Sequence, residues 1–319
     1  MTSTSAFRVA AVQMVSGPDV EANLAQADRL IGEAAAAGAA LVALPEYFPL
    51  ITTDESAKVR LRESEGGGPI QSFLRDAAVR HGVWLVGGSL PMESTEPGKV
   101  KNACLVFDER GHRVARYDKI HLFGFQKGEE RYDESATIEA GGEVVTFEAP
   151  CGEVGLSICY DLRFPELFRA MGTVDLIVLP AAFTYTTGRA HWEVLLRARA
   201  IETGSYVLAA AQGGCDLEGL GSAHIGDHQV VGVHAHRVAD DVAHLGPAAD
   251  KANPGGVGRR QIDFADRFDG DHARAGRGGA AQGPQHDAAA VAGDHEVAPL
   301  AHADLEELGH RRRQHALVH

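Results

Sequence analysis

Short apolar runs alternate with segments of helical spacing in the first part of the chain. The apolar runs predict strands at residues 8–14, 40–44 and 83–86. The segments between them carry apolar residues on one face and predict helices at 20–37 and 69–80. Asp19 is a suitable N-cap and Pro69 suits a first helical turn, while Gly38 and Gly82 are typical helix terminators.

The next part of the chain is richer in predicted strands. Two of them flank a polar, glycine-containing segment and predict a hairpin over residues 102–107 and 112–117. A polar loop follows, and further strands are predicted at 144–147, 154–158, 174–179 and 206–210. Helical spacing returns after residue 159 and again over 191–202. Strands that alternate with helices and also form hairpins predict an α/β fold with a mixed sheet.

Three reactive side chains directly follow predicted strands. Glu46 ends the run Ala-Leu-Val-Ala-Leu-Pro-Glu, Lys119 follows a half-buried strand, and Cys159 stands at a strand-to-helix junction. Side chains at the carboxyl ends of strands in α/β sheets collect into active sites. Unpaired N–H groups at a helix start favour a thiolate at Cys159 and can donate to an oxyanion. The alternative for Cys159 is a buried cysteine that packs as a small hydrophobe.

The same three residues lie in motifs. These are Leu-Pro-Glu at Glu46, Tyr-Asp-Lys-Ile-His-Leu-Phe around Lys119, and Cys-Tyr-Asp-Leu-Arg-Phe-Pro-Glu-Leu-Phe-Arg from Cys159. In this order they resemble the Glu-Lys-Cys signatures of the carbon-nitrogen hydrolase (nitrilase) superfamily, in particular its Nit-type ω-amidase or deaminated glutathione amidase branch. The resemblance covers residues 7–214. It implies a four-layer α-β-β-α sandwich that pairs into a homodimer.

Amide hydrolysis by a thiol needs a thiolate, an oxyanion site and a proton for the departing amine. Our hypothesis makes Cys159 the nucleophile, with Lys119 and the backbone N–H of Tyr160 binding the oxyanion. Glu46 acts as base toward the thiol and the hydrolytic water, and as acid toward leaving ammonia. This scheme uses neither a metal nor a cofactor.

The resemblance also implies a second glutamate in the site. Its match in this sequence is Glu134, which by its chemistry would orient Lys119 or tune the proton balance. Glu129 and Glu130 stand close by in the same polar loop and are its rivals.

Substrate contacts are expected next to these motifs. Arg163 is suited to bidentate binding of a substrate carboxylate, or alternatively to an ion pair with Asp161 or Glu166. Two further segments resemble pocket-lining parts of the family, and they contain Tyr47, Phe183 and the predicted loop Thr184-Tyr185-Thr186-Thr187. A Cys–His dyad with His121 or His191 is the competing view of the site.

Composition narrows the partners of this protein. The chain has 319 residues and a formal net charge of −14, which argues against nucleic acid or an anionic membrane as partner. No signal sequence or run of about 18 apolar residues is present, so a cytoplasmic location is expected. The four cysteines show no metal-ligand spacing and are interpreted as free thiols. The expected partners are a small-molecule amide and a second copy of the chain.

Composition changes abruptly after Gly214. Twelve of the sixteen histidines lie beyond it, whereas no Trp or Tyr does, and Ala, Gly, Asp, Arg and Val dominate. Such a stretch has too little bulky apolar surface to offset the entropy cost of ordering. We therefore divide the chain into a carbon-nitrogen hydrolase domain at 1–215 and a tail at 216–319, expected to be disordered or translated out of frame. A His-rich metal-binding tail and an unusual domain are the alternatives.

Together these features predict a hydrolase that cleaves a linear carboxamide through a Cys159 thioester and releases ammonia. The implied substrate is deaminated glutathione or a similar ω-amide. A nitrilase or an N-carbamoyl amidohydrolase is the alternative within the enzymes. From a different class, the chain would be an inactive remnant or a binding scaffold, because strands that complete the family's second sheet are not recognisable after residue 214.

Overall fold

The strands assemble into two sheets in the computed structural model, which describes residues 7–127, 130–213, 231–233 and 259–263. The first sheet contains β1 (Arg8–Val12), β2 (Leu41–Ala43), β3 (Trp84–Val86), β4 (Leu90–Glu93), β5 (Val100–Phe107), β6 (Arg113–Asp118) and β14 (Arg259–Asp263). Their order is β14-β1-β2-β3-β5-β4, with β6 also paired to β5. β1, β2 and β3 are parallel, whereas β5 is antiparallel to β3, β4 and β6.

The second sheet contains β9 (Thr146–Ala149), β10 (Gly152–Leu156), β11 (Leu176–Ala181), β12 (Tyr206–Ala211) and β13 (Val231–Val233). Its order is β13-β12-β11-β10-β9. The three central strands are parallel and the two outer ones are antiparallel to their neighbours. Both sheets are therefore mixed, as the sequence predicted.

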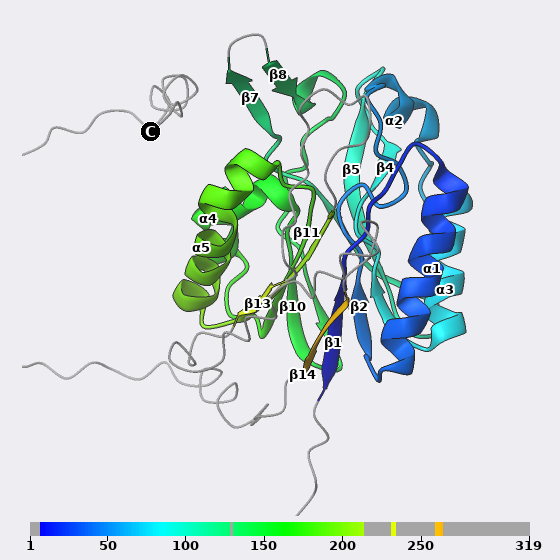
Figure 1. The fold of residues 1–319 in the computed structure, drawn as a ribbon, viewed down its shortest axis with the longest axis vertical. Helices are drawn as coiled ribbons and strands as arrows, with labels where there is room; N and C mark the ends of the chain where they lie inside the picture. The colour runs from blue at the N-terminus through cyan, green and yellow to red at the C-terminus, as the bar shows by residue number, and fades with distance from the viewer. Residues whose placement is uncertain (1–6, 128–129, 214–230, 234–258, 264–319) are drawn as a thin grey trace, which may run out of the picture. The chain divides into compact units, whose positions relative to one another are not determined.

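Helices cover the outer face of each sheet (Figure 1). α1 (Val20–Ala36) and α3 (Pro69–His81) lie on the first sheet, and α4 (Pro165–Ala170) and α5 (Tyr185–Thr203) lie on the second. One apolar cluster joins the facing sides of the two sheets, and another joins the first sheet to α1 and α3. The predicted four-layer α-β-β-α sandwich is confirmed.

Alternation along β1 shows how one strand serves two layers. Val9 and Ala11 belong to the cluster between the sheets, whereas Ala10 and Val12 pack with Leu30 and its neighbours on the helical side. Successive side chains of a strand point to opposite faces. Because both faces of the sheet are covered, the strand appears in the sequence as a continuous apolar run.

The predicted ends of α1 and α3 agree with the structure. The Asp19 side chain accepts a hydrogen bond from the backbone N–H of Ala22 at 3.1 Å and caps α1. Gly82 ends α3 in the left-handed conformation, with φ at +64°. A residue with a side chain adopts this conformation only at a cost, so the glycine is the local stop signal.

Four of the α-helices and strands within residues 7–213 were not predicted from the sequence. α2 (Ser56–Leu61) and β4 are short and lack a clear apolar period. The region predicted to be a polar loop forms a hairpin of β7 (Gly124–Lys127) and β8 (Glu130–Asp133) instead. That prediction was wrong because these two short segments are rich in polar residues and lack the apolar alternation by which sequence patterns identify a strand.

Two strands come from the segment predicted to be a tail. β13 extends the second sheet beside β12, and β14 extends the first sheet beside β1. The rest of 214–319 lies outside the described residues, so the division of the chain at residue 215 stays a prediction. Among the described residues, no helix combines the length and apolar character needed to cross a bilayer.

Candidate active site

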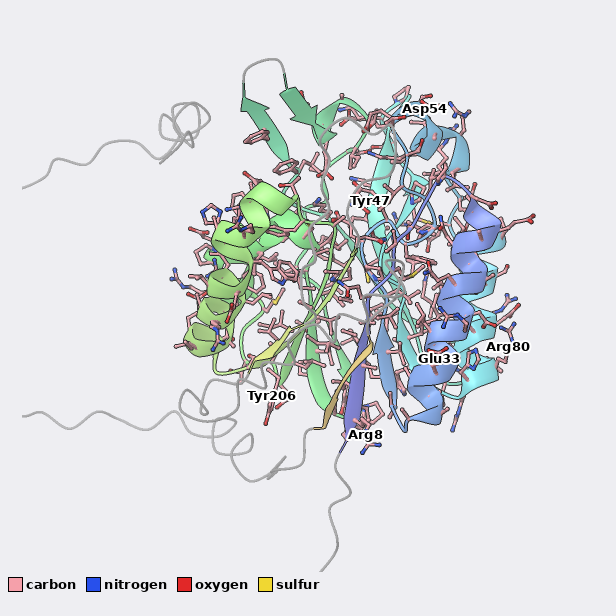
Figure 2. The ribbon with its side chains drawn as sticks, viewed as in Figure 1. Arg8, Glu33, Tyr47, Asp54, Arg80 and Tyr206 are labelled. Carbon is pink, nitrogen blue, oxygen red and sulfur yellow. The ribbon has the colours of Figure 1, made fainter. Side chains whose placement is uncertain are left out.

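Glu46, Lys119 and Cys159 lie at the same end of the two sheets. Glu46 follows β2, Lys119 follows β6, and Cys159 follows β10 after two further residues. β6 runs in the same direction as β2 and β3, because β5 is antiparallel to both β3 and β6. Tyr47, next to Glu46, marks this end in Figure 2, and Arg8 and Tyr206 mark the opposite end. The expected convergence of the three groups is therefore found.

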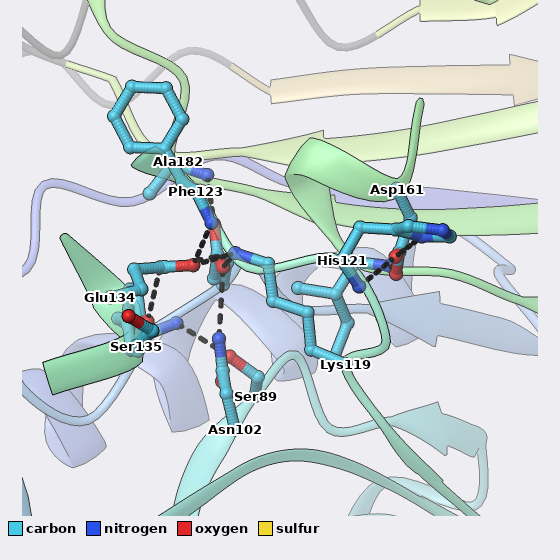
Figure 3. A network of polar contacts seen from close by, with 12 residues as sticks. Ser89, Asn102, Lys119, His121, Phe123, Glu134, Ser135, Asp161 and Ala182 are labelled. Atoms are coloured by element: carbon cyan, nitrogen blue, oxygen red, sulfur yellow. Dashed lines mark hydrogen bonds and ion pairs between the residues drawn. The ribbon is translucent and has the colours of Figure 1, made fainter. Parts of the chain in front are cut away.

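Glu46 and Lys119 form a buried ion pair. The Lys119 Nζ lies 2.8 Å from the Glu46 Oε1, and each side chain is 1% exposed. The same Oε1 accepts a hydrogen bond from Asn102 Nδ2 at 3.0 Å, and Oε2 accepts one from the backbone N–H of Ala182 at 2.9 Å (Figure 3). Both carboxylate oxygens are thus held by fixed donors from the two sheets.

Glu134 completes the ion-pair network from the other side of Lys119. Its Oε2 and Oε1 lie 2.8 and 3.1 Å from the Lys119 Nζ. Tyr47 donates its hydroxyl hydrogen to Oε1 at 2.8 Å, and the backbone N–H of Phe123 donates to Oε2 at 2.7 Å. Of its two sequence rivals, Glu129 lies outside the described residues and Glu130 is part of β8.

Burial and charge act in opposite directions on these groups. Burial alone would lower the pKa of Lys119, but the two neighbouring carboxylates raise it well above its ordinary value. Burial would likewise raise the pKa of Glu134, and the Lys119 ammonium and its hydrogen bonds hold it below 4.5. For Glu46, burial outweighs the ammonium and its pKa is raised. Glu46 is therefore the carboxylate of the pair that takes up a proton more readily.

Cys159 is the first residue of a 3-10 turn, Cys159–Arg163, and its φ is +47°. A non-glycine residue in the left-handed region is uncommon and requires support from its surroundings. The side chain is buried, and burial together with the adjacent Glu46 raises the pKa of the thiol well above 9. Glu46 therefore opposes ionisation of the thiol, while Lys119 favours the thiolate. The resting thiol is protonated beside a carboxylate, so the thiolate expected from the helix start is not the resting form.

Close backbone packing supports the turn that carries Glu46. Tyr47 has a φ of +54°, and its backbone N–H donates to the Ser89 hydroxyl at 3.0 Å. Gly88, with a φ of +58°, approaches so closely that an added Cβ would lie 2.2 Å from the Pro45 carbonyl oxygen. Only glycine fits at this close approach of the two backbones.

The residues expected to contact substrate lie around the Cys159 turn. The Arg163 guanidinium lies 5.7 Å from the Tyr160 ring centroid and 5.5 Å from that of Phe183. Its hydrogen-bond partner is His191 Nδ1 at 3.1 Å, rather than Asp161 or Glu166. The guanidinium is thus positioned between two aromatic rings.

The predicted loop Thr184-Tyr185-Thr186-Thr187 is not a loop. Thr184 is the N-cap residue of α5, and Tyr185 begins this helix six residues before the predicted start. The Thr184 and Thr187 hydroxyl oxygens lie 2.7 Å apart across its first turn. Polar residues fill this turn, so it lacks the apolar period that indicates a helix.

The histidines of the competing Cys–His dyad have other partners. His121 Nδ1 lies 2.7 Å from Asp161 Oδ1, and the His121 ring stacks on Phe164. His191 is exposed and hydrogen-bonds with Arg163. The partner of the Cys159 thiol is a carboxylate, which favours the glutamate scheme.

Sequence analysis missed Asn102, Gln212 and the partners of Asp161. Asn102 is a polar residue within an apolar strand, and this break in the pattern was the available signal. Gln212 donates to the Glu46 carbonyl oxygen at 3.0 Å and to the Ser16 hydroxyl at 2.9 Å. Within the described residues, no group of three or more His, Cys, Asp or Glu side chains is arranged to hold a metal ion.

The site combines a buried cysteine with a glutamate and a lysine at the ends of two facing sheets. This arrangement is typical of a hydrolase that uses a cysteine thiol as its nucleophile. A family model described as carbon-nitrogen hydrolase matches residues 8–236. The chain therefore belongs to the carbon-nitrogen hydrolase family, and the resemblance of the three motifs is confirmed. The match extends past the boundary predicted at residue 215.

Two relatives with assigned activities match a similar share of the chain. A deaminated glutathione amidase of Yersinia enterocolitica is 43% identical over 211 residues, which are 65% of this chain and 73% of the relative. An omega-amidase NIT2 of Xenopus tropicalis is 40% identical over 209 residues, covering 64% of this chain and 74% of the relative.

Solved structures share the fold. The NitFhit protein of C. elegans has a TM-score of 0.63 and 36% identity, over 73% of this chain and 56% of that chain. A mutant of the amidase from Nesterenkonia sp. AN1 has a TM-score of 0.57 and 25% identity, over 72% and 85% of the two chains. That structure shows the result of Michael addition of acrylamide at the active site cysteine.

Proposed function

We propose that this protein is an amidase that hydrolyses a small linear carboxamide bearing a carboxylate, through a thioester on Cys159. One observation carries the proposal: a single buried carboxylate, Glu46, is ion-paired with Lys119 and lies close enough to the Cys159 thiol to raise its pKa. A nucleophile, its base and a cation therefore lie at one buried site. This arrangement fits acyl transfer.

In the acylation step, the Cys159 sulfur attacks the amide carbon as its proton passes to Glu46. The carbonyl oxygen becomes an oxyanion, which Lys119 and the Tyr160 backbone N–H stabilise. The intermediate then collapses: the C–N bond breaks, and Glu46 returns the proton to the leaving nitrogen, which departs as ammonia. The raised pKa of Glu46 suits a group that both accepts and donates this proton.

Deacylation repeats these roles with water. Glu46 takes a proton from the water as its oxygen attacks the thioester carbon, and the same two donors hold the second oxyanion. The C–S bond then breaks, the carboxylic acid product leaves, and the proton on Glu46 returns to the Cys159 sulfur. Glu134 takes no proton in this cycle, because its lowered pKa keeps it ionised beside Lys119.

Arg163 supplies the basis for substrate preference. Its planar guanidinium can bind a carboxylate with two parallel hydrogen bonds, and it follows the nucleophile by only four residues. Phe183 and Thr184 border the same region, and Tyr47 lies on the Glu134 side. The names of the relatives point to the same chemistry, an ω-amide or deaminated glutathione.

Two alternatives are distinguished by product analysis. A nitrilase would release ammonia from a nitrile, and an N-carbamoyl amidohydrolase would release it together with carbon dioxide. An inactive remnant would release none. The thiol, base and cation all lie within the described residues, the base and cation form an ion pair, and both act on the pKa of the thiol, which favours an active enzyme over a remnant.

The test is ammonia release from a panel of ω-amides, a neutral amide, a nitrile and an N-carbamoyl acid. We expect turnover of the ω-amides, and a mass increase on Cys159 that equals the acyl group when the reaction is quenched early. Cys159→Ala should be folded and inactive. Turnover by Cys159→Ala, or turnover of the nitrile alone, would contradict the proposal.

We further propose a cytoplasmic homodimer. Val194 and Ile201 are 66% and 57% exposed and lie seven residues apart on α5, so they share one helix face. An exposed apolar stripe of this kind suits a subunit contact. Sedimentation should give a dimer for the wild type and a monomer for the Val194→Glu/Ile201→Glu double variant. A monomeric wild type would contradict this assignment.

The division into a domain at 1–215 and an out-of-frame tail at 216–319 remains our proposal. Its support is the change in composition after Gly214. Sequencing of the gene across codon 215 and limited proteolysis with mass spectrometry test it. A protease-resistant tail would refute the proposal.

A further inference from the structure

Asp161 is a completely buried carboxylate that takes no part in the proton transfers above. Its Oδ2 accepts hydrogen bonds from the Tyr117 hydroxyl at 2.6 Å and the Ile158 backbone N–H at 2.8 Å. Its Oδ1 accepts one from the His121 backbone N–H at 2.9 Å and lies 2.7 Å from His121 Nδ1. Four donors for one buried carboxylate make this a fully satisfied centre.

The partners of Asp161 bracket two residues of the reaction. Tyr117 and His121 stand two positions before and two positions after Lys119, and Ile158 directly precedes Cys159. Figure 3 shows the His121–Asp161 contact beside the extended Lys119 side chain. One carboxylate therefore connects the segment that carries the cation to the turn that carries the nucleophile.

The connection fixes the Cys159 turn from within. The Asp161 N–H donates to the Ile158 carbonyl oxygen at 3.0 Å, while the Asp161 side chain accepts from the Ile158 N–H. The His121 ring also stacks on Phe164, with centroids 3.6 Å apart, just after the turn. Cys159 needs such support, because its φ of +47° is not a resting conformation for a residue with a side chain.

The Lys119 backbone is held on its other sides. Its N–H donates to the Asn102 carbonyl oxygen at 2.9 Å, and its carbonyl oxygen accepts from Gly141 at 2.8 Å. Neither contact reaches the second sheet, which carries Cys159. Among the described hydrogen bonds, those of Asp161 are the ones that connect residues next to Lys119 with the Cys159 turn.

We infer that Asp161 is a positioning residue that sets the Lys119 ammonium against the Cys159 sulfur at the geometry the oxyanion needs. The inference rests on the proposed function for the identity of the oxyanion site. Misplacement of a catalytic group by about 1 Å costs on the order of 10²-fold in rate. Loss of this connection should therefore lower kcat more than it alters KM.

Asp161→Asn tests the role directly, because the shape is kept while one of the two acceptor oxygens becomes a donor. We expect kcat for an ω-amide to fall about 10²-fold, with KM nearly unchanged. The rate of Cys159 alkylation by iodoacetamide, followed by mass spectrometry of its peptide, should fall in parallel. A folded Asp161→Asn variant with wild-type kcat and alkylation rate would overturn the inference.

Two milder variants keep the test open if Asp161→Asn does not fold. Tyr117→Phe and His121→Phe each remove one donor and retain an aromatic ring. Each should lower kcat about 10-fold with KM retained, and the pair together should approach Asp161→Asn. Wild-type kcat in both single variants would refute the positioning role.

Glu63→Gln is the matched control. Glu63 is also a buried carboxylate, and it accepts from the backbone N–H groups of Ile70 and Gln71 at the start of α3. This variant should lose stability but keep its kcat. A fall in kcat equal to that of Asp161→Asn would show that the loss of any buried charge has this effect, and it would overturn the inference.

The rate of Cys159 alkylation can still be measured if the wild type releases no ammonia from any amide. That outcome would refute only the proposed function.

Discussion

The two sheets contribute different chemistry to one site. The strands of the first sheet lead into Glu46 and Lys119, and the Lys119 segment continues to Glu134, so this side supplies buried charges. The strands of the second sheet lead into Cys159 and Ala182, which supply a neutral thiol and a backbone N–H. Neither half contains a reactive set by itself.

The two sheets therefore carry different energetic costs. The first sheet buries an ammonium between two carboxylates, which requires every member of the network to be present. The second sheet buries a thiol that is uncharged at rest, and its demand is backbone strain at Cys159 instead of desolvation of charge. Variants on the two sides should therefore fail in different ways.

Lys119→Met is expected to have the largest effect, because it leaves two carboxylates buried without their cation. We expect activity to be lost and the free energy of unfolding to fall by about 3–5 kcal/mol. Urea unfolding near pH 7 measures the change in the free energy of unfolding. Lys99→Met removes a surface pair with Glu96 and should change stability by less than about 1 kcal/mol. Similar losses in the two variants would remove the distinction between buried and exposed charge.

The same network predicts the pH dependence of stability. The folded pKa of Glu134 is lowered, so its contribution is present above 4.5 and is lost as the pH falls through the folded value. The folded pKa of Lys119 is raised, so its contribution is present below 10.5 and is lost as the pH rises through the folded value. Lys119→Met should flatten both limbs of the stability profile.

Glu46→Gln separates the base from the nucleophile. We expect kcat to fall about 10²- to 10⁴-fold because proton transfer is lost. The pKa of the Cys159 thiol should nevertheless fall, since the adjacent carboxylate raises it in the wild type. Alkylation by iodoacetamide as a function of pH measures this shift, and Glu148→Gln, an exposed change, is the control. An unchanged thiol pKa would show that Glu46 does not act on the sulfur.

In the wild type, activity should fall as the pH is lowered through the pKa of Glu46, which is raised above 4.5. Protonated Glu46 can no longer accept the thiol proton. This decrease of activity at low pH should disappear in Glu46→Gln. The residual activity of the variant should instead depend on the ionisation of the Cys159 thiol.

Arg163→Lys tests the substrate side of the second sheet. A lysine keeps the charge but not the planar pair of donors, so KM for a carboxylate-bearing amide should rise about 10-fold. A neutral amide of the same length should show no change, which makes it the internal control. Equal effects on both substrates would mean that Arg163 shapes the site without binding the carboxylate.

Gln212→Ala addresses the junction between the sheets and should have the smallest effect on catalysis. Its amide joins Ser16 to the Glu46 backbone, and removal leaves buried polar groups unpaired at a cost of about 1–3 kcal/mol. Activity should fall as well, because Glu46 loses a support. Gln71→Ala, at a buried glutamine of α3, should lower stability alone.

Much of this structure follows from local patterns. The run before Glu46 predicts its strand, and Asp19 and Gly82 mark helix ends by their own side-chain and backbone chemistry. The strands β7 and β8 were missed because their short, polar sequences carry no apolar period. The carboxylate partners of Lys119 were predicted through motifs, not through periodicity.

Contacts between distant segments could not be predicted in this way. Asn102 and Asp161 are as polar as many surface residues, and only the fold shows that one holds Glu46 and the other binds Tyr117 and His121. Such residues act through partners separated by tens of positions in the chain. The periodicity of apolar residues indicates a single helix or strand and does not predict contacts between distant segments.

The carboxylates of Glu46 and Glu134 are both paired with the single ammonium of Lys119, so the resting active site carries an excess negative charge there. A second anion brought close to that point would be repelled, and the acidic end of a substrate must therefore be directed away from it. Recognition then depends on the span between the amide and the acid group of the molecule. Chain length, more than overall chemical character, should decide which compounds this enzyme accepts.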